Sequence, residues 1–255
     1  MSLKISFKNS RNLTLIGTLW EAQSNAIVVM AHGSGSNRFS RGLFEQIARA
    51  LQQQQYNILA FDFSGHGESD DDIFNTQKSI DDLNAALDYV KAQGYQHIAL
   101  FGHSFGSLSC LKAFSPDIKT MVLLGSLMGP VKWRWEEHYT PEQLQQIKNN
   151  RYITSEVNDG LRAIIKTDLA IFDEILAIDQ NQLLSNVTCP VLIMHGDADQ
   201  DELDLFDFAR KGLPLLRDGS ELVIIHGASH LFLDHVKQVI SLTKTWLHDN
   251  FPPTN

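Results

Sequence analysis

Short apolar runs alternate with longer segments of helical periodicity along most of this chain, and no other feature limits the possible folds so strongly. Continuous apolar runs predict strands at 27–31, 57–61, 97–101, 119–125, 190–195 and 220–226. Apolar residues at helical spacing predict helices at 40–54, 77–92, 104–114, 202–217 and 232–250. Strands that alternate with helices form parallel sheets covered on both faces. Two further segments, 2–8 and 12–20, alternate like antiparallel edge strands, so we expect an α/β protein with an eight-stranded, mostly parallel sheet.

The alternation breaks between about residues 130 and 186. Helical patterns recur there, at 141–149, 156–166 and 168–178, with no buried strand among them. We therefore expect 130–186 to be a small helical cap inserted into a single domain that spans 1–255, a length within the range of one α/β domain.

Charge and composition restrict the kinds of partner that the protein can bind. Asp and Glu outnumber Lys and Arg by 30 to 21, which gives a formal net charge of −9, and nucleic-acid binding lacks its basic footprint. No apolar stretch is near the ~18 residues of a membrane span, and the N-terminal segment has no signal-peptide pattern. The two cysteines, Cys110 and Cys189, make no disulfide framework. We expect a cytoplasmic protein with no membrane span, and the sequence does not predict its oligomeric state.

The turn after the strand at 97–101 carries the clearest chemical motif. Gly102-His103-Ser104-Phe105-Gly106 fits Gly-x-Ser-x-Gly between a strand pattern and a helix pattern, the context in which this motif presents a serine nucleophile on a sharp turn. The hydroxyl of Ser104 then lies at a helix N-terminus, where developing negative charge is favoured. Ser104 is the predicted nucleophile, and an ordinary N-cap serine in a glycine-rich turn is the alternative.

A glycine-containing loop follows the strand at 27–31. In His32-Gly33-Ser34-Gly35-Ser36, we expect the backbone N–H of Ser34 to form an oxyanion hole with that of Phe105. A phosphate-binding loop is the alternative, but the Gly-x-x-x-x-Gly-Lys pattern is absent. No cofactor is expected.

His230 is the predicted base. It lies in Gly227-Ala228-Ser229-His230, between the last predicted strand and the last predicted helix, at the same edge of the sheet as Ser104. The chain order of serine, acid and histidine favours it over His226, which we expect to end the strand and point into packing.

The acid is expected on the loop after the strand at 190–195. Asp197, Asp199 and Asp201 all lie there, and a carboxylate is needed to hold the imidazole in the correct tautomer. Asp201 is expected to cap the following helix and Asp197 to be a turn residue. A calcium loop is the alternative, but Glu202 stands where that loop requires glycine, so no metal site is expected.

Together these motifs resemble the α/β-hydrolase superfamily over nearly the whole chain. The N-terminal half is similar to the small bacterial feruloyl/cinnamoyl esterases and related serine-aminopeptidase-like (S33-type) hydrolases. The matching stretches are HGSGSNR (32–38), FDFSGHGESD (61–70), GHSFG (102–106), HGDAD (195–199) and GASHLF (227–232). The resemblance implies that Asp199 completes a triad with Ser104 and His230. It also implies a wider acyl side of the pocket, because the family usually has a large residue where Ser34 stands.

The substrate pocket has three further candidates. Trp133 and Trp135, in an aromatic-rich stretch at the start of the predicted cap, could line an acyl or alcohol pocket, or simply attach the cap to the sheet. His103, beside the nucleophile, is predicted to be structural or to line the pocket.

The predicted function is hydrolysis of a carboxylic ester of a small to medium substrate through an acyl-enzyme intermediate. The same triad would serve a thioesterase, an amidase or aminopeptidase, an acyltransferase or a perhydrolase. A catalytically silent small-molecule receptor is the alternative from another class, and the filled triad positions disfavour it.

Overall fold

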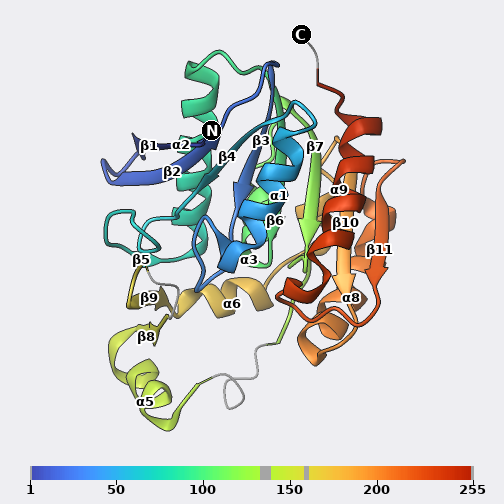
Figure 1. The fold of residues 1–255 in the computed structure, drawn as a ribbon. Coiled ribbons are helices and arrows are strands. Elements are labelled where there is room, and N and C mark those ends of the chain that lie inside the picture. The colour runs from blue at the N-terminus through green and yellow to red at the C-terminus, as the bar shows by residue number, and fades with distance from the viewer. Residues whose placement is uncertain (1, 133–138, 158–160, 254–255) are drawn as a thin grey trace.

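The computed structural model describes residues 2–132, 139–157 and 161–253. Eight strands form one sheet in the order β1-β2-β4-β3-β6-β7-β10-β11 (Figure 1). They are β1 (Ser2–Lys8), β2 (Thr14–Trp20), β3 (Ala26–Ala31), β4 (Asn57–Phe61), β6 (His97–His103), β7 (Ile118–Leu124), β10 (Val191–Gly196) and β11 (Glu221–Ile225). β1 pairs antiparallel with β2, and β2 with β4, while the six strands from β4 to β11 are parallel. The predicted eight-stranded, mostly parallel sheet is confirmed.

Helices cover both faces of the sheet because each face buries its own apolar cluster. On one face, α1 (Leu43–Gln52) and α9 (Val236–Asn250) contribute Phe44, Leu51 and Leu247. On the other, α2 (Thr76–Ala92), α3 (Phe105–Lys112) and α8 (Gln200–Gly212) contribute Leu83, Leu108 and Leu205 (Figure 1). The described residues also form the short 3₁₀ helices η1 (Ser40–Gly42), η2 (Leu213–Leu215) and η3 (Leu233–His235).

The block between β7 and β10 is not purely helical. It contains α5 (Pro141–Asn150), α6 (Ala170–Leu176) and α7 (Gln180–Leu184), but the predicted helix at 156–166 is wrong. β8 (Tyr152–Glu156) and β9 (Ile164–Asp168) are antiparallel strands, and with β5 (Ile73–Phe74) they form a second, three-stranded sheet. Along β9, Ile165 and Thr167 are buried, while Ile164 and Lys166 are exposed and Asp168 is half-buried. That period of two, carried by β-branched residues, favours a strand over a helix.

The carboxyl ends of the six parallel strands lie at one edge of the large sheet. The loops that leave β3, β4, β6, β7, β10 and β11 therefore meet at this edge, and they carry every motif that the sequence singled out. Within the described ranges, none of the helices combines the length and apolar character that crossing a membrane requires.

Candidate active site

Ser104 occupies a strained turn between β6 and α3. Its backbone has φ 53° and ψ −122°, a region that a non-glycine residue adopts only under constraint. A Cβ on Gly106 would lie 2.1 Å from the carbonyl oxygen of Ala31, and a Cβ on Gly102 would lie 2.6 Å from the Cα of Ser107. Both glycines are therefore needed for the close approach of strand and helix, and the turn holds the Ser104 hydroxyl at the edge of the sheet.

The imidazole of His230 lies beside this hydroxyl. Nε2 of His230 is 2.9 Å from Oγ of Ser104. The ring of His103 packs 5.3 Å from the ring of His230, and His103 Nε2 donates to the backbone oxygen of His230 at 2.8 Å. Burial lowers the pKa of His103 to about 4, so this ring is neutral and holds the loop that carries His230.

The ring nitrogen of His230 that faces away from Ser104 bonds to Glu202, a residue that the sequence analysis did not consider as the acid. His230 Nδ1 lies 2.5 Å from Oε1 of Glu202, whose side chain is 0% exposed. Because Glu202 is in the first turn of α8, its carboxylate points back beneath the loop after β11. Glu202 thus has the contact expected of the acid in a triad.

The prediction that Asp199 bonds to the His230 ring is wrong. Asp199 is the N-cap of α8: its Oδ1 accepts from the backbone N of Glu202 at 2.8 Å, and its Oδ2 accepts from the backbone N of His230 at 2.7 Å. The expectation that Asp201 caps this helix is therefore also wrong. Asp199 followed three residues later by Glu202 is a capping-box pattern, and this signal could have located the helix start and moved the search for the acid into the helix.

Asp197 and His226 form a separate surface contact. Asp197 accepts from the backbone N of Gly227 at 2.6 Å, as a turn residue would, and lies 2.7 Å from Nδ1 of His226. β11 ends one residue before His226, whose side chain is 84% exposed, so the expectation that His226 points into packing is wrong.

The second oxygen of Glu202 is held by two further donors. Nδ1 of His195 lies 2.8 Å from Oε2, and the backbone N of Gly196 donates to the same oxygen at 2.7 Å. Nε2 of His195 in turn lies 2.9 Å from Oγ of Ser126. The result is a continuous row of contacts from the partly exposed Ser104 and His230 to the buried Glu202, His195 and Ser126.

The charges of Glu202 and His230 stabilise one another. Burial raises the pKa of Glu202, but hydrogen bonds from His195 and His230 outweigh burial and lower that pKa to about 2. Burial lowers the pKa of His230, but the hydrogen bond and the charge of Glu202 outweigh it and raise that pKa above its usual value. The site therefore favours an ionised Glu202 beside an imidazole that readily accepts a proton, as a general base must.

The backbone N–H groups predicted for the oxyanion hole lie on two loops beside Ser104. Phe105 is the first residue of α3, where an N–H has no partner within the helix. Ser34 lines the same hollow as Ser104, and a Cβ on Gly33 would lie 3.1 Å from Cβ of Ser104, so this loop runs against Ser104. His66 accepts from the backbone N of Gly35 at 3.4 Å, and burial lowers the pKa of His66 to about 3, which keeps it a neutral acceptor.

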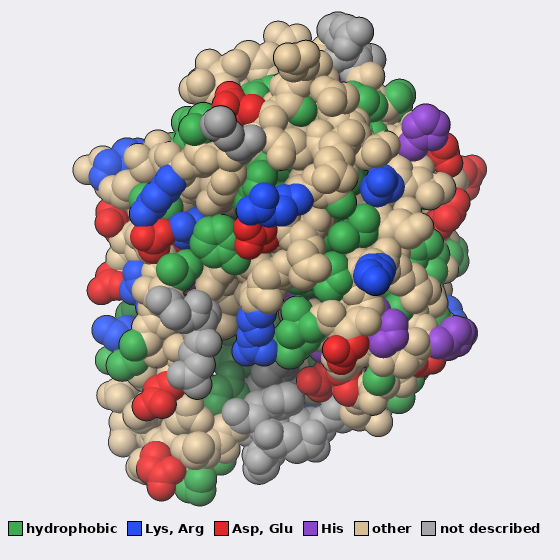
Figure 2. Space-filling view, in the orientation of Figure 1, with side chains coloured by type: hydrophobic (Ala, Val, Ile, Leu, Met, Phe, Trp, Pro, Cys, Tyr) green, Lys and Arg blue, Asp and Glu red, His purple; other side chains and the backbone are tan. Residues whose placement is uncertain are grey.

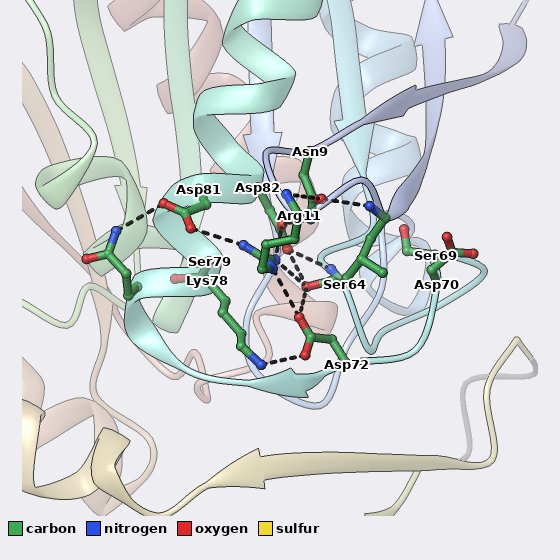
Figure 3. A network of polar contacts seen from close by, with 12 residues as sticks. Asn9, Arg11, Ser64, Ser69, Asp70, Asp72, Lys78, Ser79, Asp81 and Asp82 are labelled. Carbon is green, nitrogen blue, oxygen red and sulfur yellow. Dashed lines mark hydrogen bonds and ion pairs between the residues drawn. The ribbon is translucent and has the colours of Figure 1, made fainter.

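Two polar networks fix the loops behind the site. Asp62, at the end of β4, is 0% exposed and accepts from both the backbone N and the guanidinium of Arg38. Below it, Arg11 in the β1–β2 turn bonds to Ser64, Asp72 and Asp82 and so joins the edge hairpin to α2 (Figure 3). These networks give a structural role to Arg38 of the 32–38 motif and to Asp62 and Ser64 of the 61–70 motif.

A cavity of about 190 Å³ opens beside Ser104 and His230. Most of its wall is apolar, and its described lining includes Leu127, Val131, Ile171, Phe172, Ile175 and Leu205. Asp201, Asp204, Lys132 and Thr167 add polar groups. Thr167 comes from β9 and three of the apolar residues from α6, so the inserted block supplies part of the wall. Trp133 and Trp135 lie outside the described residues.

Charged groups on the face shown in Figure 2 are mixed, with Lys and Arg scattered among acidic side chains. That face presents no continuous basic surface.

The sheet order, the turn at Ser104 and the Ser104–His230 pair define the α/β-hydrolase fold. A family model described as serine aminopeptidase, S33, matches residues 22–202, which is most of the chain. The chain therefore belongs to this family of hydrolases.

Solved structures support the same fold. The protein is similar to Est1E from Butyrivibrio proteoclasticus, solved with ferulic acid bound, at TM-score 0.78 and 19% identity, with 96% of this chain and 98% of that chain covered. It is also similar to the α/β hydrolase GrgF from Penicillium sp. sh18, at TM-score 0.78, 16% identity and coverage of 98% and 99%. The esterase domain of a Rhodothermus marinus protein matches at TM-score 0.72, 20% identity and coverage of 98% of both chains. No curated protein sequence matches this chain.

Proposed function

We propose that this hydrolase cleaves a carboxylic ester of a small to medium substrate through an acyl-enzyme intermediate. The observation that carries the proposal is the row of contacts in which His230 bonds to Ser104 at 2.9 Å on one side and to Glu202 at 2.5 Å on the other. The esterases among the similar structures favour an ester over the other substrates that such a triad accepts.

Each residue has a defined step. Ser104 Oγ attacks the ester carbonyl carbon while its proton passes to Nε2 of His230, and the N–H groups of Ser34 and Phe105 stabilise the oxyanion. Collapse of this intermediate breaks the bond to the alcohol, which leaves with the proton from His230. Water then attacks the acyl-enzyme with His230 again as base, and the acid and free Ser104 are released. Glu202 keeps the Nδ1 proton in place and stabilises the imidazolium.

The inserted block also has a place in the proposed function. We propose that the block at about 130–186 caps the active site of a single domain, because α6 and β9 supply part of the cavity wall.

We also propose that the protein is cytoplasmic, since Cys110 and Cys189 are buried free thiols, as expected in a reducing compartment.

Covalent labelling tests the nucleophile. A fluorophosphonate is expected to modify one serine, and peptide mapping should place the adduct on Ser104. The control is Ser107→Ala, which removes another hydroxyl in the same turn. Labelling that persists unchanged in Ser104→Ala would refute the assignment, whatever the substrate.

Aminopeptidase activity is the second candidate. The family description favours it, and the carboxylates of Asp201 and Asp204 on the cavity wall could receive a substrate ammonium group. Comparing 4-nitrophenyl butyrate with an aminoacyl 4-nitroanilide separates the two, because an aminopeptidase cleaves the anilide at a substantial fraction of the ester rate.

A further inference from the structure

Two hollows border on Ser104, and they differ in how polar their walls are. The apolar cavity of about 190 Å³ lies on one side. On the other lies a hollow of about 80 Å³, which also borders on Ser104 and His230. The glycine- and serine-rich 33–36 loop, Ser40 and Arg41 form one part of its wall, and Leu231 and Leu233 form another. A substrate held at Ser104 therefore meets a mostly apolar environment in the larger hollow and a mixed one, with an arginine on its wall, in the smaller hollow.

Of the described residues that line this smaller hollow, Arg41 is the only Lys, Arg, Asp or Glu. Among the described residues it forms no ion pair, whereas Arg11, Arg38 and Arg162 each bond to carboxylates. Glu156 shares a neighbouring hollow with Arg41, but no ion pair joins them. The hollow is thus a local site of positive charge in a chain whose net charge is −9.

The backbone that presents Arg41 is strained. Ser40 has φ 47° and Arg41 has φ 55°, a left-handed conformation that non-glycine residues seldom adopt twice in succession. Backbone bonds from Ser40 N to Asn37 O and from Gly42 N to Phe39 O, both 2.9 Å, close the turn. Buried Arg38 precedes this turn and buried Leu43 follows it, so Arg41 stands on a fixed support. Strain retained beside a reactive serine points to a role in binding.

We propose that the substrate is the ester of an apolar acyl group with an alcohol that carries a carboxylate or phosphate, and that Arg41 binds this anion. The inference rests on the proposed function and extends it to the substrate class. The apolar cavity takes the acyl group, the smaller hollow takes the alcohol, and the planar guanidinium pairs with two oxygens of the anion.

The test compares the butyrate esters of 3-hydroxybenzoate and 3-hydroxybenzamide, which share a shape and differ in charge. The readout is the ratio of kcat/KM for the two esters. We expect wild type to prefer the carboxylate, Arg41→Gln to lower this ratio about five-fold or more, and Arg41→Lys to retain part of it. Arg49→Gln is the matched control, because Arg49 makes the same change in net charge on the exposed side of α1, away from the hollow.

The outcomes separate the two proposals. An unchanged ratio in Arg41→Gln, or an equal fall in Arg49→Gln, overturns the inference. So does a wild-type enzyme that labels at Ser104 and shows no preference for the carboxylate ester. Failure of Ser104 to label overturns the proposed function instead. Benzoate and inorganic phosphate, compared as competitive inhibitors of the neutral ester in wild type and Arg41→Gln, identify which anion the site prefers.

Discussion

Replacing Glu202 with Gln removes a charge that three N–H groups share. The carboxylate accepts from His230, His195 and the backbone N of Gly196. A Gln amide has one oxygen and one NH₂ group, so at least one of these donors faces another donor. If His230 is that donor, its ring shifts to the tautomer with the proton on Nε2, and this tautomer cannot accept the Ser104 proton.

The size of the effect follows from the pKa of Glu202. A fall from 4.5 to about 2 means that the site stabilises the carboxylate over the acid by about 3 kcal/mol. In the transition state, the same carboxylate faces a full imidazolium. We therefore expect Glu202→Gln to lower kcat by as much as ~10⁴-fold, the loss seen when the acid of a triad is neutralised.

Asp199→Asn is the matched control, because it makes the same chemical change three residues earlier. Asn caps a helix about as well as Asp, but its NH₂ would face the backbone N–H of His230 where Oδ2 now accepts. We therefore expect a lower Tm and a loss of kcat of about ten-fold or less, far smaller than that of Glu202→Gln. The assay is kcat for 4-nitrophenyl butyrate, with Tm and circular dichroism to show that both variants fold. If Asp199→Asn is folded and inactive while Glu202→Gln keeps most of its activity, the acid is Asp199 and the reasoning here fails.

Four further results are expected. Because His230 acts as base only when neutral and its pKa is raised, kcat/KM should rise with pH through a titration above 6.5; a midpoint below 6.5 contradicts this. His195→Leu removes a hydrogen-bond donor from Glu202 and makes the carboxylate more basic, so it should move the titration of kcat/KM to higher pH. His195→Asn keeps an N–H donor and should move this titration less. Equal pH profiles for wild type and both variants would refute the role of His195 in tuning Glu202. The lowered pKa of Glu202 stabilises the folded protein above pH 4.5, and this stabilisation is lost as pH falls toward 2. Between pH 4.5 and 2, the free energy of unfolding should therefore fall more steeply with pH in wild type than in Glu202→Gln, as followed by circular dichroism. Gly106→Ala should lower the free energy of unfolding by about 3 kcal/mol, measured in urea, because its Cβ would lie 2.1 Å from a backbone oxygen; a stable variant would show that the turn can relax.

Local patterns predicted the large sheet because each of its strands carries its own signal. The apolar runs of β3, β4, β6, β7 and β10 are buried along their whole length, apart from one exposed residue near the start of β7 and the first residue of β6. The inserted block was harder to predict, because β8 buries only Ile153 and β9 buries only Ile165 and Thr167. Their short apolar stretches also fit a helix. The resemblance to a family selected Asp199 by its spacing from His195, but it carried no information on side-chain direction.

Local sequence patterns were enough to predict the α/β architecture, the turn at Ser104 and the position of His230 at the same edge of the sheet, since strand order along the chain brings parallel carboxyl ends together. Which carboxylate reaches the imidazole became known from the folded structure alone. That choice depends on where α8 begins: with Asp199 as N-cap, the first turn of the helix directs Glu202 inward to His230 and His195. A shift of two residues in the helix start would present a different side chain, and such a shift is set by packing and capping together rather than by any local pattern.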